Sequence, residues 1–234
     1  MPKKNHLQQV FDDTLDRGRK YRISQSTPIT LQNIHMYPAK TGHNYNADIV
    51  LQDCIDVAYN LSDKYNVALL NMASIHVPGG GVLKGCTAQE EQLCRRSNLY
   101  HSLIHASNFY PLKEFSGLST KNVTIFKDAS NIVIDPRSVT VITVAAYQNP
   151  KGEYNYQGMI NKIRLIVVGA LEAGCDCLIL SALGCGAYNN PPGKVAECFK
   201  YVLYTEGYVD YFSKVIIAIY NEENYRPFVD TMGT

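Results

Sequence analysis

The sequence predicts an α/β protein in which helices cover both faces of a mostly parallel sheet. Several short segments are apolar throughout and rich in β-branched residues, such as residues 139–145 (VTVITVA) and 215–220 (VIIAIY), which is typical of strands buried on both faces. Segments with helical periodicity alternate with these strands, as in parallel strands joined by crossover helices. The 234 residues contain no internal repeat and no Pro- or Ser-rich linker, so we expect one domain over residues 1–234, with its core at about residues 7–220.

Periodicity and capping residues place the elements in order. The predictions are helix 5–18, strand 29–37, a loop at 40–46, helix 53–63, strand 67–70, helix 88–105, an irregular stretch 106–137 with a possible strand at 123–126, strand 139–145, a loop at 149–156, helix 157–173, strand 177–181, helix 194–205, strand 215–220 and a short terminal helix capped by Asn221. Thr87 is a suitable N-cap for the helix 88–105, and Thr87-Ala88-Gln89-Glu90 matches a capping box. Within that helix, Arg95 and Arg96 are expected in solvent or paired with acids.

Composition argues against several classes of protein. Formal net charge is +1, from 22 basic and 21 acidic residues, so no strong field favours a nucleic acid or a membrane surface. There is no long apolar run of the kind that spans a membrane, and the N-terminal stretch lacks the apolar core of a secretory signal. Seven scattered cysteines indicate reduced thiols in the cytoplasm. The Cys175–Cys177 pair has no further ligands at zinc spacing, so no metal is expected.

Two glycine-rich loops directly follow buried strands. The first, residues 74–87, contains Pro-Gly-Gly-Gly, and the second, residues 183–192 (LGCGAYNNPP), follows the strand 177–181. Ligands of open α/β sheets bind beyond the carboxyl ends of the strands. Glycine permits close backbone approach, and free N–H groups near helix starts favour anions. Facing each other, the two loops could hold a diphosphate, although neither matches a P-loop or a dinucleotide fingerprint.

The adjacent acids Glu90 and Glu91 follow the first loop. Neighbours on a helix are about 100° apart, so the two side chains cannot have the same role. Glu90 has a structural explanation as the acid of the capping box. Glu91 has none, which makes it the stronger candidate for a catalytic carboxylate. In the second loop, Tyr188 follows the glycine turn, where its ring could pack on a ribose.

These motifs resemble those of a known family. The run PGGGVLKGCTAQEE, residues 78–91, resembles the signature of poly(ADP-ribose) glycohydrolases: a glycine triplet, a short spacer and Gln-Glu-Glu. The run LGCGAYNNPPGKVAECF, residues 183–199, is similar to the diphosphate loop of the macrodomain fold. The segments FDDTL, LNMAS, LCRRSNLY and VITVAA look like those of the compact bacterial-type members. The resemblance implies a macrodomain-like fold, a mixed and mostly parallel sheet sandwiched between helices in three α/β/α layers.

The resemblance also implies residue roles. Glu91 matches the catalytic glutamate, and Glu90 matches the neighbouring acid that contacts the ribose, a role that competes with the capping box. The substrate-binding residues implied are Asn71, Ser74, Gly79, Gly80, Gly81, Gln89, Gly184, Cys185, Gly186, Ala187 and Tyr188. Tyr188 replaces the phenylalanine common at that position, and Asp53 is a candidate for contact with the adenine. No cofactor and no metal are implied.

The activity implied is hydrolysis of the ribose–ribose O-glycosidic bonds of poly(ADP-ribose), releasing ADP-ribose from the polymer on ADP-ribosylated proteins. Two alternatives stay open: a hydrolase that removes single ADP-ribosyl groups from an acceptor, and a non-catalytic ADP-ribose-binding macrodomain. The sequence departs from bacterial-type relatives at His76-Val77, where basic and amide residues are more usual. It leaves open whether cleavage is endo or exo. No membrane partner and no sequence-specific binding of nucleic acid are expected.

Overall fold

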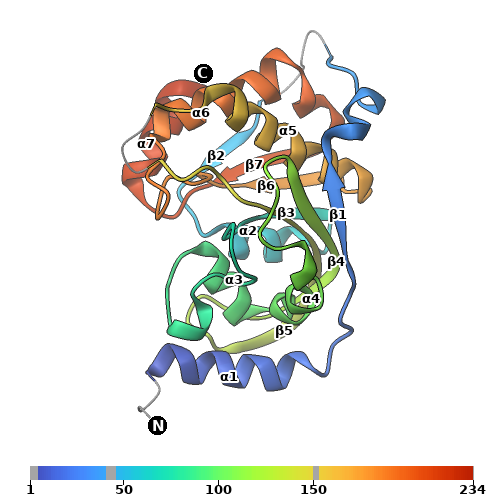
Figure 1. Ribbon diagram of the computed structural model, residues 1–234, viewed down its shortest axis with the longest axis vertical. Coiled ribbons are helices and arrows are strands. Elements are labelled where there is room, and N and C mark those ends of the chain that lie inside the picture. Colours follow the sequence, from blue (N-terminus) through green and yellow to red (C-terminus); the bar gives the residue numbers. More distant parts are fainter. Residues whose placement is uncertain (1–4, 41–45, 150–152, 234) are drawn as a thin grey trace.

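A seven-stranded mixed sheet forms the centre of the protein, with strand order β1-β4-β5-β3-β6-β7-β2 (Figure 1). The computed structural model describes residues 5–40, 46–149 and 153–233, so parts of the predicted loops 40–46 and 149–156 lie outside it. The strands are β1 (Ser26–Thr30), β2 (Asp48–Val50), β3 (Val67–Met72), β4 (Ser116–Lys127), β5 (Val133–Val144), β6 (Cys177–Leu180) and β7 (Lys214–Ala218). The pairs β5–β3, β3–β6, β6–β7 and β7–β2 are parallel, whereas β1–β4 and β4–β5 are antiparallel. The mixed, mostly parallel sheet predicted from the sequence is confirmed.

Helices cover both faces of this sheet. The α-helices are α1 (His6–Gly18), α2 (Cys54–Leu61), α3 (Gln89–Arg96), α4 (Leu99–His105), α5 (Tyr156–Glu172), α6 (Pro192–Lys200) and α7 (Glu222–Met232), with shorter helical turns η1 (Leu31–Met36), η2 (Val82–Lys84), η3 (Ser107–Phe109), η4 (Tyr201–Thr205) and η5 (Tyr208–Tyr211). One hydrophobic cluster joins the sheet to α5, α6 and α7, and a second joins it to α1, α2, α3 and α4. The protein therefore has the three layers expected of a macrodomain-like fold.

The central strand β3 shows why its sequence is apolar at successive positions. Ala68 and Leu70 belong to the cluster beneath α5 and α6, whereas Val67 and Leu69 belong to the cluster beneath α2 and α3. Successive side chains of a strand point to opposite faces. Both faces of β3 are covered, so every position is apolar until Asn71.

Two predicted strand assignments were wrong. Residues 106–137 were expected to be irregular apart from a possible strand at 123–126. That strand lies within β4, but the segment contains the whole of β4 and the start of β5, which form a long antiparallel hairpin. Register shifts at Thr120/Val123 and Ile125/Lys127 interrupt the alternation of this hairpin, and the first half of β5 is largely exposed, so its sequence is polar. The strand predicted at 29–37 is instead the short β1 followed by the turn η1. The three-residue β2 was not predicted.

The single helix predicted at 88–105 is divided into α3 and α4. Ser97 between them is extended, with φ −144° and ψ 174°, and pairs with Ile125 of β4. The next amide, Asn98 N–H, donates to the Thr124 carbonyl at 3.1 Å. Hydrogen bonding to the edge of β4 thus competes with the helix and ends it.

Helix α1 is fastened to the sheet by the buried ammonium group of Lys127. Its Nζ lies 2.7 Å from the Asp13 carboxylate and donates to Thr14 Oγ1 at 2.7 Å and the Val10 carbonyl at 3.2 Å. The Thr14 hydroxyl also donates to the Arg95 carbonyl at 2.5 Å. Because Arg95 is in α3, these bonds place α1 against the helix that carries Glu90 and Glu91.

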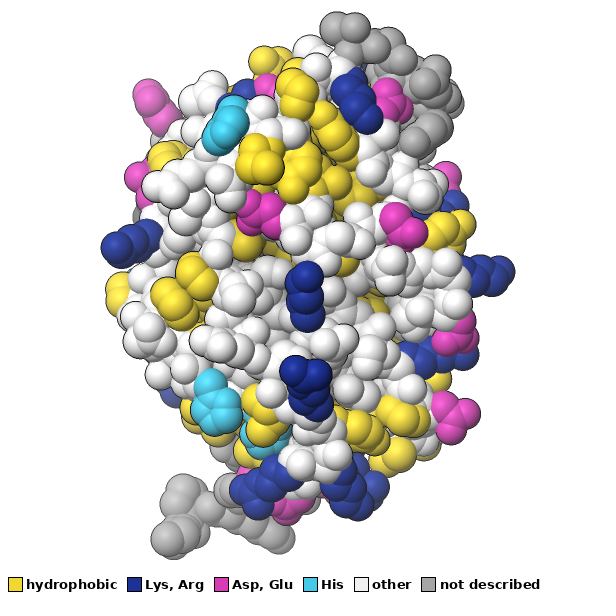
Figure 2. Space-filling model, turned by 90° about the vertical axis from the view of Figure 1, so that its right-hand side faces the viewer, with side chains coloured by type: hydrophobic (Ala, Val, Ile, Leu, Met, Phe, Trp, Pro, Cys, Tyr) yellow, Lys and Arg dark blue, Asp and Glu magenta, His cyan; other side chains and the backbone are white. Residues whose placement is uncertain are grey.

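The surface has charges of both signs. On the face shown in Figure 2, the Lys, Arg, Asp and Glu side chains of the described residues are interspersed with apolar and uncharged ones. Within the described part of the chain, no helix is both long and apolar enough to cross a membrane.

We predict that Lys127→Met lowers the free energy of unfolding by about 1–3 kcal/mol, because three acceptors on α1 lose their donor. Lys121→Met, which removes an exposed lysine of the same strand, should change it by less than about 0.5 kcal/mol. Urea denaturation followed by circular dichroism measures both. Equal effects of the two variants would contradict the anchoring role of Lys127.

Candidate active site

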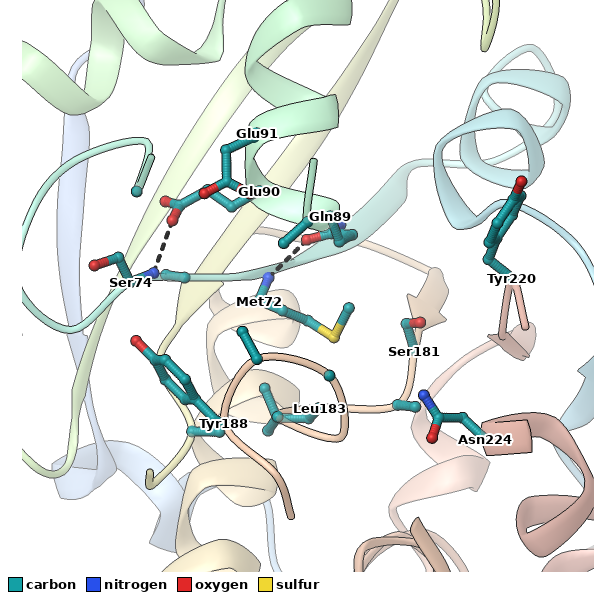
Figure 3. A pocket seen from close by; sticks show the side chains of 18 of the residues that line it. Met72, Ser74, Gln89, Glu90, Glu91, Ser181, Leu183, Tyr188, Tyr220 and Asn224 are labelled. Atoms are coloured by element: carbon teal, nitrogen blue, oxygen red, sulfur yellow. Dashed lines mark hydrogen bonds between the residues drawn. The ribbon is translucent and has the colours of Figure 1, made fainter. Parts of the chain in front are cut away.

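A cavity of about 470 Å³ opens at the carboxyl ends of the parallel strands. Both glycine loops line it: the first contributes Ser74, Gly80 and Gly81, and the second contributes Gly184, Gly186, Ala187 and Tyr188. The start of α3 adds Gln89, Glu90 and Glu91 (Figure 3). The two loops therefore face each other across one cavity, as the sequence predicts, and its volume suits a small organic ligand.

Glu90 is an anchor for the first loop. Its side chain is only 2% exposed, and its Oε2 accepts a hydrogen bond from Ser74 N–H at 2.7 Å. Its Oε1 accepts from Gly79 N–H at 3.2 Å and from Asn71 Nδ2 at 3.3 Å. Burial raises the pKa of Glu90 to about 7, against the opposing effect of the hydrogen bonds from Ser74 and Asn71.

Glu91 differs in having a free oxygen. Its Oε1 accepts from Gly81 N–H at 2.7 Å, whereas its buried Oε2 has no hydrogen-bond partner among the described residues. Gly80 makes this approach possible, since its φ is +55° and a Cβ there would lie 2.6 Å from Glu91 Oε1. Glu91 also lines the cavity, so its carboxyl group lies beside the space for a ligand, with which such a group can exchange a proton.

The predicted capping box is absent. The N-cap of α3 is Ala88 rather than Thr87, and no side chain caps the helix. The backbone donors of the first loop draw the Glu90 carboxylate away from the helix start. Gln89 is also held by backbone groups: its Oε1 accepts from Met72 N–H at 2.9 Å and its Nε2 donates to the Leu70 carbonyl at 2.8 Å. The amide of Gln89 therefore joins α3 to the end of β3.

Three of the predicted binding residues lie behind the cavity wall. Asn71 is fully buried and bonds to Glu90 and to Thr143 Oγ1 at 3.3 Å. Gly79 donates to Glu90 from within the loop, and Cys185 packs against the hydrophobic core. Asn71, Gly79 and Cys185 therefore support the residues of the cavity wall and do not line the cavity themselves.

The second loop is held by Asn190, which sequence reasoning missed. Its Nδ2 donates to the Tyr147 carbonyl at 2.7 Å and to the Gly184 carbonyl at 3.0 Å. Gly184 has φ +74°, and a Cβ there would lie 2.6 Å from Asn190 Nδ2. An asparagine just after a glycine turn was the available signal. The neighbouring Tyr188 reaches the other loop, because its hydroxyl accepts from Ile75 N–H at 3.1 Å.

Sequence reasoning also missed the residues of the cavity wall opposite the two glutamates. Tyr220 and Asn224, from the end of β7 and the start of α7, lie across the cavity from Glu90 and Glu91 (Figure 3). The Tyr220 side chain is 81% exposed, and an aromatic residue directly after the last strand was the signal for it. A second cavity of about 380 Å³ shares Tyr220, Met72, Gln89 and Ser181 with the first.

Asp53 and Arg96 line this second cavity. Asp53 caps α2, since its Oδ1 accepts from Ile55 N–H and Asp56 N–H at 2.9 Å each. Arg96 Nη1 donates to the same oxygen at 2.9 Å, and Arg96 also pairs with Asp56. The expectation that Arg96 pairs with acids is confirmed, but both Arg95 and Arg96 are buried, so solvent exposure is wrong for either.

No group of three or more His, Cys, Asp or Glu residues is placed to hold a metal ion within residues 5–40, 46–149 and 153–233. The groups that line the cavity include the two carboxyl groups, glycine backbone and the Tyr188 ring.

Fold and site together define a macrodomain-like α/β protein with paired carboxylates at a cleft between two glycine loops. A family model described as the catalytic domain of microbial-type PARG, poly(ADP-ribose) glycohydrolase, matches residues 6–130. The chain belongs to this family and is a glycoside hydrolase of the poly(ADP-ribose) glycohydrolase class. No curated protein sequence matches it.

Solved structures agree in fold. The poly(ADP-ribose) glycohydrolase of Thermomonospora curvata has a TM-score of 0.86 at 20% identity, covering 97% of this chain and 100% of that one. Its complex with the inhibitor ADP-HPD gives 0.85 at 22% identity, covering 97% and 99%. The Deinococcus radiodurans enzyme in complex with ADP-ribose gives 0.77 at 24% identity, covering 93% and 96%.

The raised pKa of Glu90 predicts a pH dependence of stability. The folded protein keeps the proton of Glu90 up to about pH 7, whereas a free glutamate has a pKa of 4.5. Between these values the folded state binds more protons than the unfolded chain, so Glu90 makes the free energy of unfolding fall as pH rises. Glu90→Gln should reduce this fall, measured by urea denaturation from pH 4.5 to 8.

The amide of Glu90→Gln also alters hydrogen bonds, but it does so equally at every pH. The quantity to compare is therefore the slope of the free energy of unfolding against pH. Glu223→Gln, at an exposed position, is the control and should keep the slope of the parent. An identical slope in Glu90→Gln and the parent would show that Glu90 does not carry this dependence.

Proposed function

We propose that the protein cleaves the ribose–ribose O-glycosidic bonds of poly(ADP-ribose) with Glu91 as general acid and base. The observation that carries the proposal is the position of Glu91. Glu91 lines the cavity; one oxygen is fixed by Gly81 N–H at 2.7 Å, and the other is buried without a partner among the described residues. A carboxyl group oriented in this way can give its proton to a leaving oxygen and recover one from water.

The glycine loops bind the diphosphate. Both line the same cavity, and glycine lets backbone N–H groups approach phosphate oxygens closely. The Deinococcus radiodurans relative was solved in complex with ADP-ribose, which supports a ligand of this class. Energy from binding the diphosphate holds the reacting ribose in place without taking part in the chemistry.

The reaction proceeds in two proton transfers at Glu91. Its carboxyl group protonates the 2′-oxygen of the departing ribose while positive charge develops on the sugar carbon that loses it. The resulting carboxylate then accepts a proton from the water that attacks that carbon. Tyr188 of the second loop lines the cavity, where its ring packs on the reacting ribose.

Glu90 supports this chemistry by holding the loop. Three donors converge on its carboxylate, so it fixes Ser74 and Gly79 on either side of the turn. The contact with ribose that the family resemblance implies is compatible with this role, since Glu90 also lines the cavity. Asn71 acts behind it by donating to Glu90.

The adenine lies at the opposite end. Tyr220 presents an exposed ring there, and bases stack readily on aromatic rings. Asp53 lines the adjoining cavity, which supports a contact with the adenine, although its Oδ1 already accepts from two backbone N–H groups and Arg96.

Residues 1–234 form one poly(ADP-ribose) glycohydrolase-type domain, supported by the participation of β1 and β7 in the same sheet. The partners are poly(ADP-ribose), ADP-ribose and ADP-ribosylated proteins. All seven cysteines are free, which supports the reducing setting of the cytoplasm.

We predict that Glu91→Gln and Glu91→Ala lower turnover of labelled poly(ADP-ribose) by about 10²–10⁴-fold, because the acid–base contribution is lost. Calorimetry should show that both variants still bind ADP-ribose. Glu223→Gln is the control for loss of a carboxylate. Turnover of polymer by Glu91→Ala at the parental rate would refute the mechanism.

The products and substrates of the same assay separate the alternatives. Monomeric ADP-ribose alone indicates exo-cleavage, and oligomers indicate endo-cleavage. Release from a mono-modified acceptor but not from polymer identifies a mono-ADP-ribosyl-acceptor hydrolase. Binding of ADP-ribose by the parent without release from either substrate identifies a non-catalytic reader.

Gly186 provides a test of the diphosphate loop. A Cβ at Gly186 would meet no atom within 4 Å, so Gly186→Ala should leave the free energy of unfolding unchanged. It should weaken ADP-ribose binding about tenfold, because the methyl group occupies space that phosphate needs. Calorimetry measures the affinity.

Gly193→Ala is the matched control, since Gly193 also has nothing within 4 Å but does not line the cavity. It should bind ADP-ribose as the parent does. Unchanged affinity in Gly186→Ala would place the diphosphate elsewhere.

A further inference from the structure

Arg95 is a buried guanidinium that the proposed reaction does not use. Its side chain is 0% exposed, and its Nη1 donates to the Cys86 carbonyl at 2.7 Å. Its Nε and Nη2 are buried without a hydrogen-bond partner among the described residues. The adjacent Arg96 differs, because it is paired with Asp53 and Asp56. A buried charge without a close counter-ion is costly, so its retention calls for an explanation.

The carboxylate of Glu91 provides the main favourable charge interaction of the Arg95 guanidinium. The two residues are four apart on α3, which places them on the same face of the helix with about 5–6 Å between their Cβ atoms. Burial lowers the pKa of Arg95, and the charge of Glu91 is the strongest effect opposing this. Glu91 Oε2 is itself buried without a partner in the described part of the chain.

A short series of hydrogen bonds also joins Arg95 to Glu91 through the first loop. Gly81 N–H donates to Glu91 Oε1 at 2.7 Å. The Gly81 carbonyl accepts from Cys86 N–H at 3.2 Å, and the Cys86 carbonyl accepts from Arg95 Nη1. The loop segment 81–86 is thus fixed to α3 at two points, one helical turn apart.

We propose that Arg95 is a positioning residue for Glu91. By holding Cys86, it keeps Gly81 N–H on one oxygen of Glu91 and leaves the other for the substrate. Its buried positive charge stabilises the carboxylate that forms after Glu91 has given up its proton. This inference rests on the proposed role of Glu91 and adds the residue that orients it.

The test compares Arg95→Met and Arg95→Lys with the parent. Replacing a buried charge by an apolar side chain of similar size is often neutral for stability, so Arg95→Met should fold. It should lower kcat on labelled poly(ADP-ribose) about 10- to 100-fold, because a small misplacement of the acid slows the reaction. Its affinity for ADP-ribose should stay within about threefold of the parent, and Arg95→Lys, with its charge and donor, should restore most of kcat.

Gln8→Ala is the matched control. Gln8 Nε2 donates to the Leu83 carbonyl at 2.9 Å, so it tethers the same loop from α1 without reaching Glu91. Its kcat should stay within about twofold of the parent. If Gln8→Ala and Arg95→Met lose the same activity, general tethering of the loop explains the effect and the proposal fails.

Three further outcomes decide the matter. A folded Arg95→Met with parental kcat overturns the proposal, as does an equal loss of kcat and ADP-ribose affinity without rescue by lysine. If Arg95→Met does not fold, Arg95→Gln, which keeps an N–H donor but no charge, takes its place with the same criteria. Glu91→Gln is measured beside them: parental turnover in that variant would sink the proposed function itself, whatever the Arg95 variants show.

Discussion

The site depends on one buried carboxylate, that of Glu90. A carboxylate removed from water must be compensated by hydrogen bonds, and here Ser74 N–H, Gly79 N–H and Asn71 Nδ2 provide them. Those donors belong to the loop and to the end of β3. The requirement to satisfy Glu90 therefore fixes the shape of the turn that separates them, and with it the place of Gly80 and Gly81.

Glu91 inherits its geometry from this arrangement. It follows Glu90 on the same helix turn, so its direction is set once Glu90 and Gln89 are bound to β3 and the loop. Gly80 and Gly81 then come close to its Oε1. Both oxygens of Glu90 accept hydrogen bonds, whereas one oxygen of Glu91 has no partner among the described residues. Two adjacent glutamates can therefore have different roles.

Sequence reasoning was most successful where burial dictates the pattern. Runs such as 67–70 and 215–218 are apolar because both faces of the sheet are covered. The first lies within β3, and β7 ends at Ala218, two residues before the end of the strand predicted at 215–220. Only parts of the β4–β5 hairpin were predicted, at 123–126 and 139–145, because bulges and partial exposure remove the periodicity of the rest. The capping box at Thr87 failed for a different reason: local preference was overridden by tertiary donors that no local pattern reveals. Asn190 acts through a hydrogen bond to Tyr147 in another loop, and Tyr220 lines a cavity formed by segments far apart in the chain. The sequence alone could not show which segments meet.

The hydrogen bond between the Tyr188 hydroxyl and Ile75 N–H has a consequence for how the cleft meets its ligand. It links the loop supported by α3 with the loop supported by α6, so their spacing is set before anything binds. A cleft that is already organised loses less conformational freedom when it is filled. The phenylalanine common in the family has no hydroxyl with which to make this bond. In this chain the Tyr188 side chain thus combines an aromatic ring in the cavity wall with a hydrogen bond that joins the two loops.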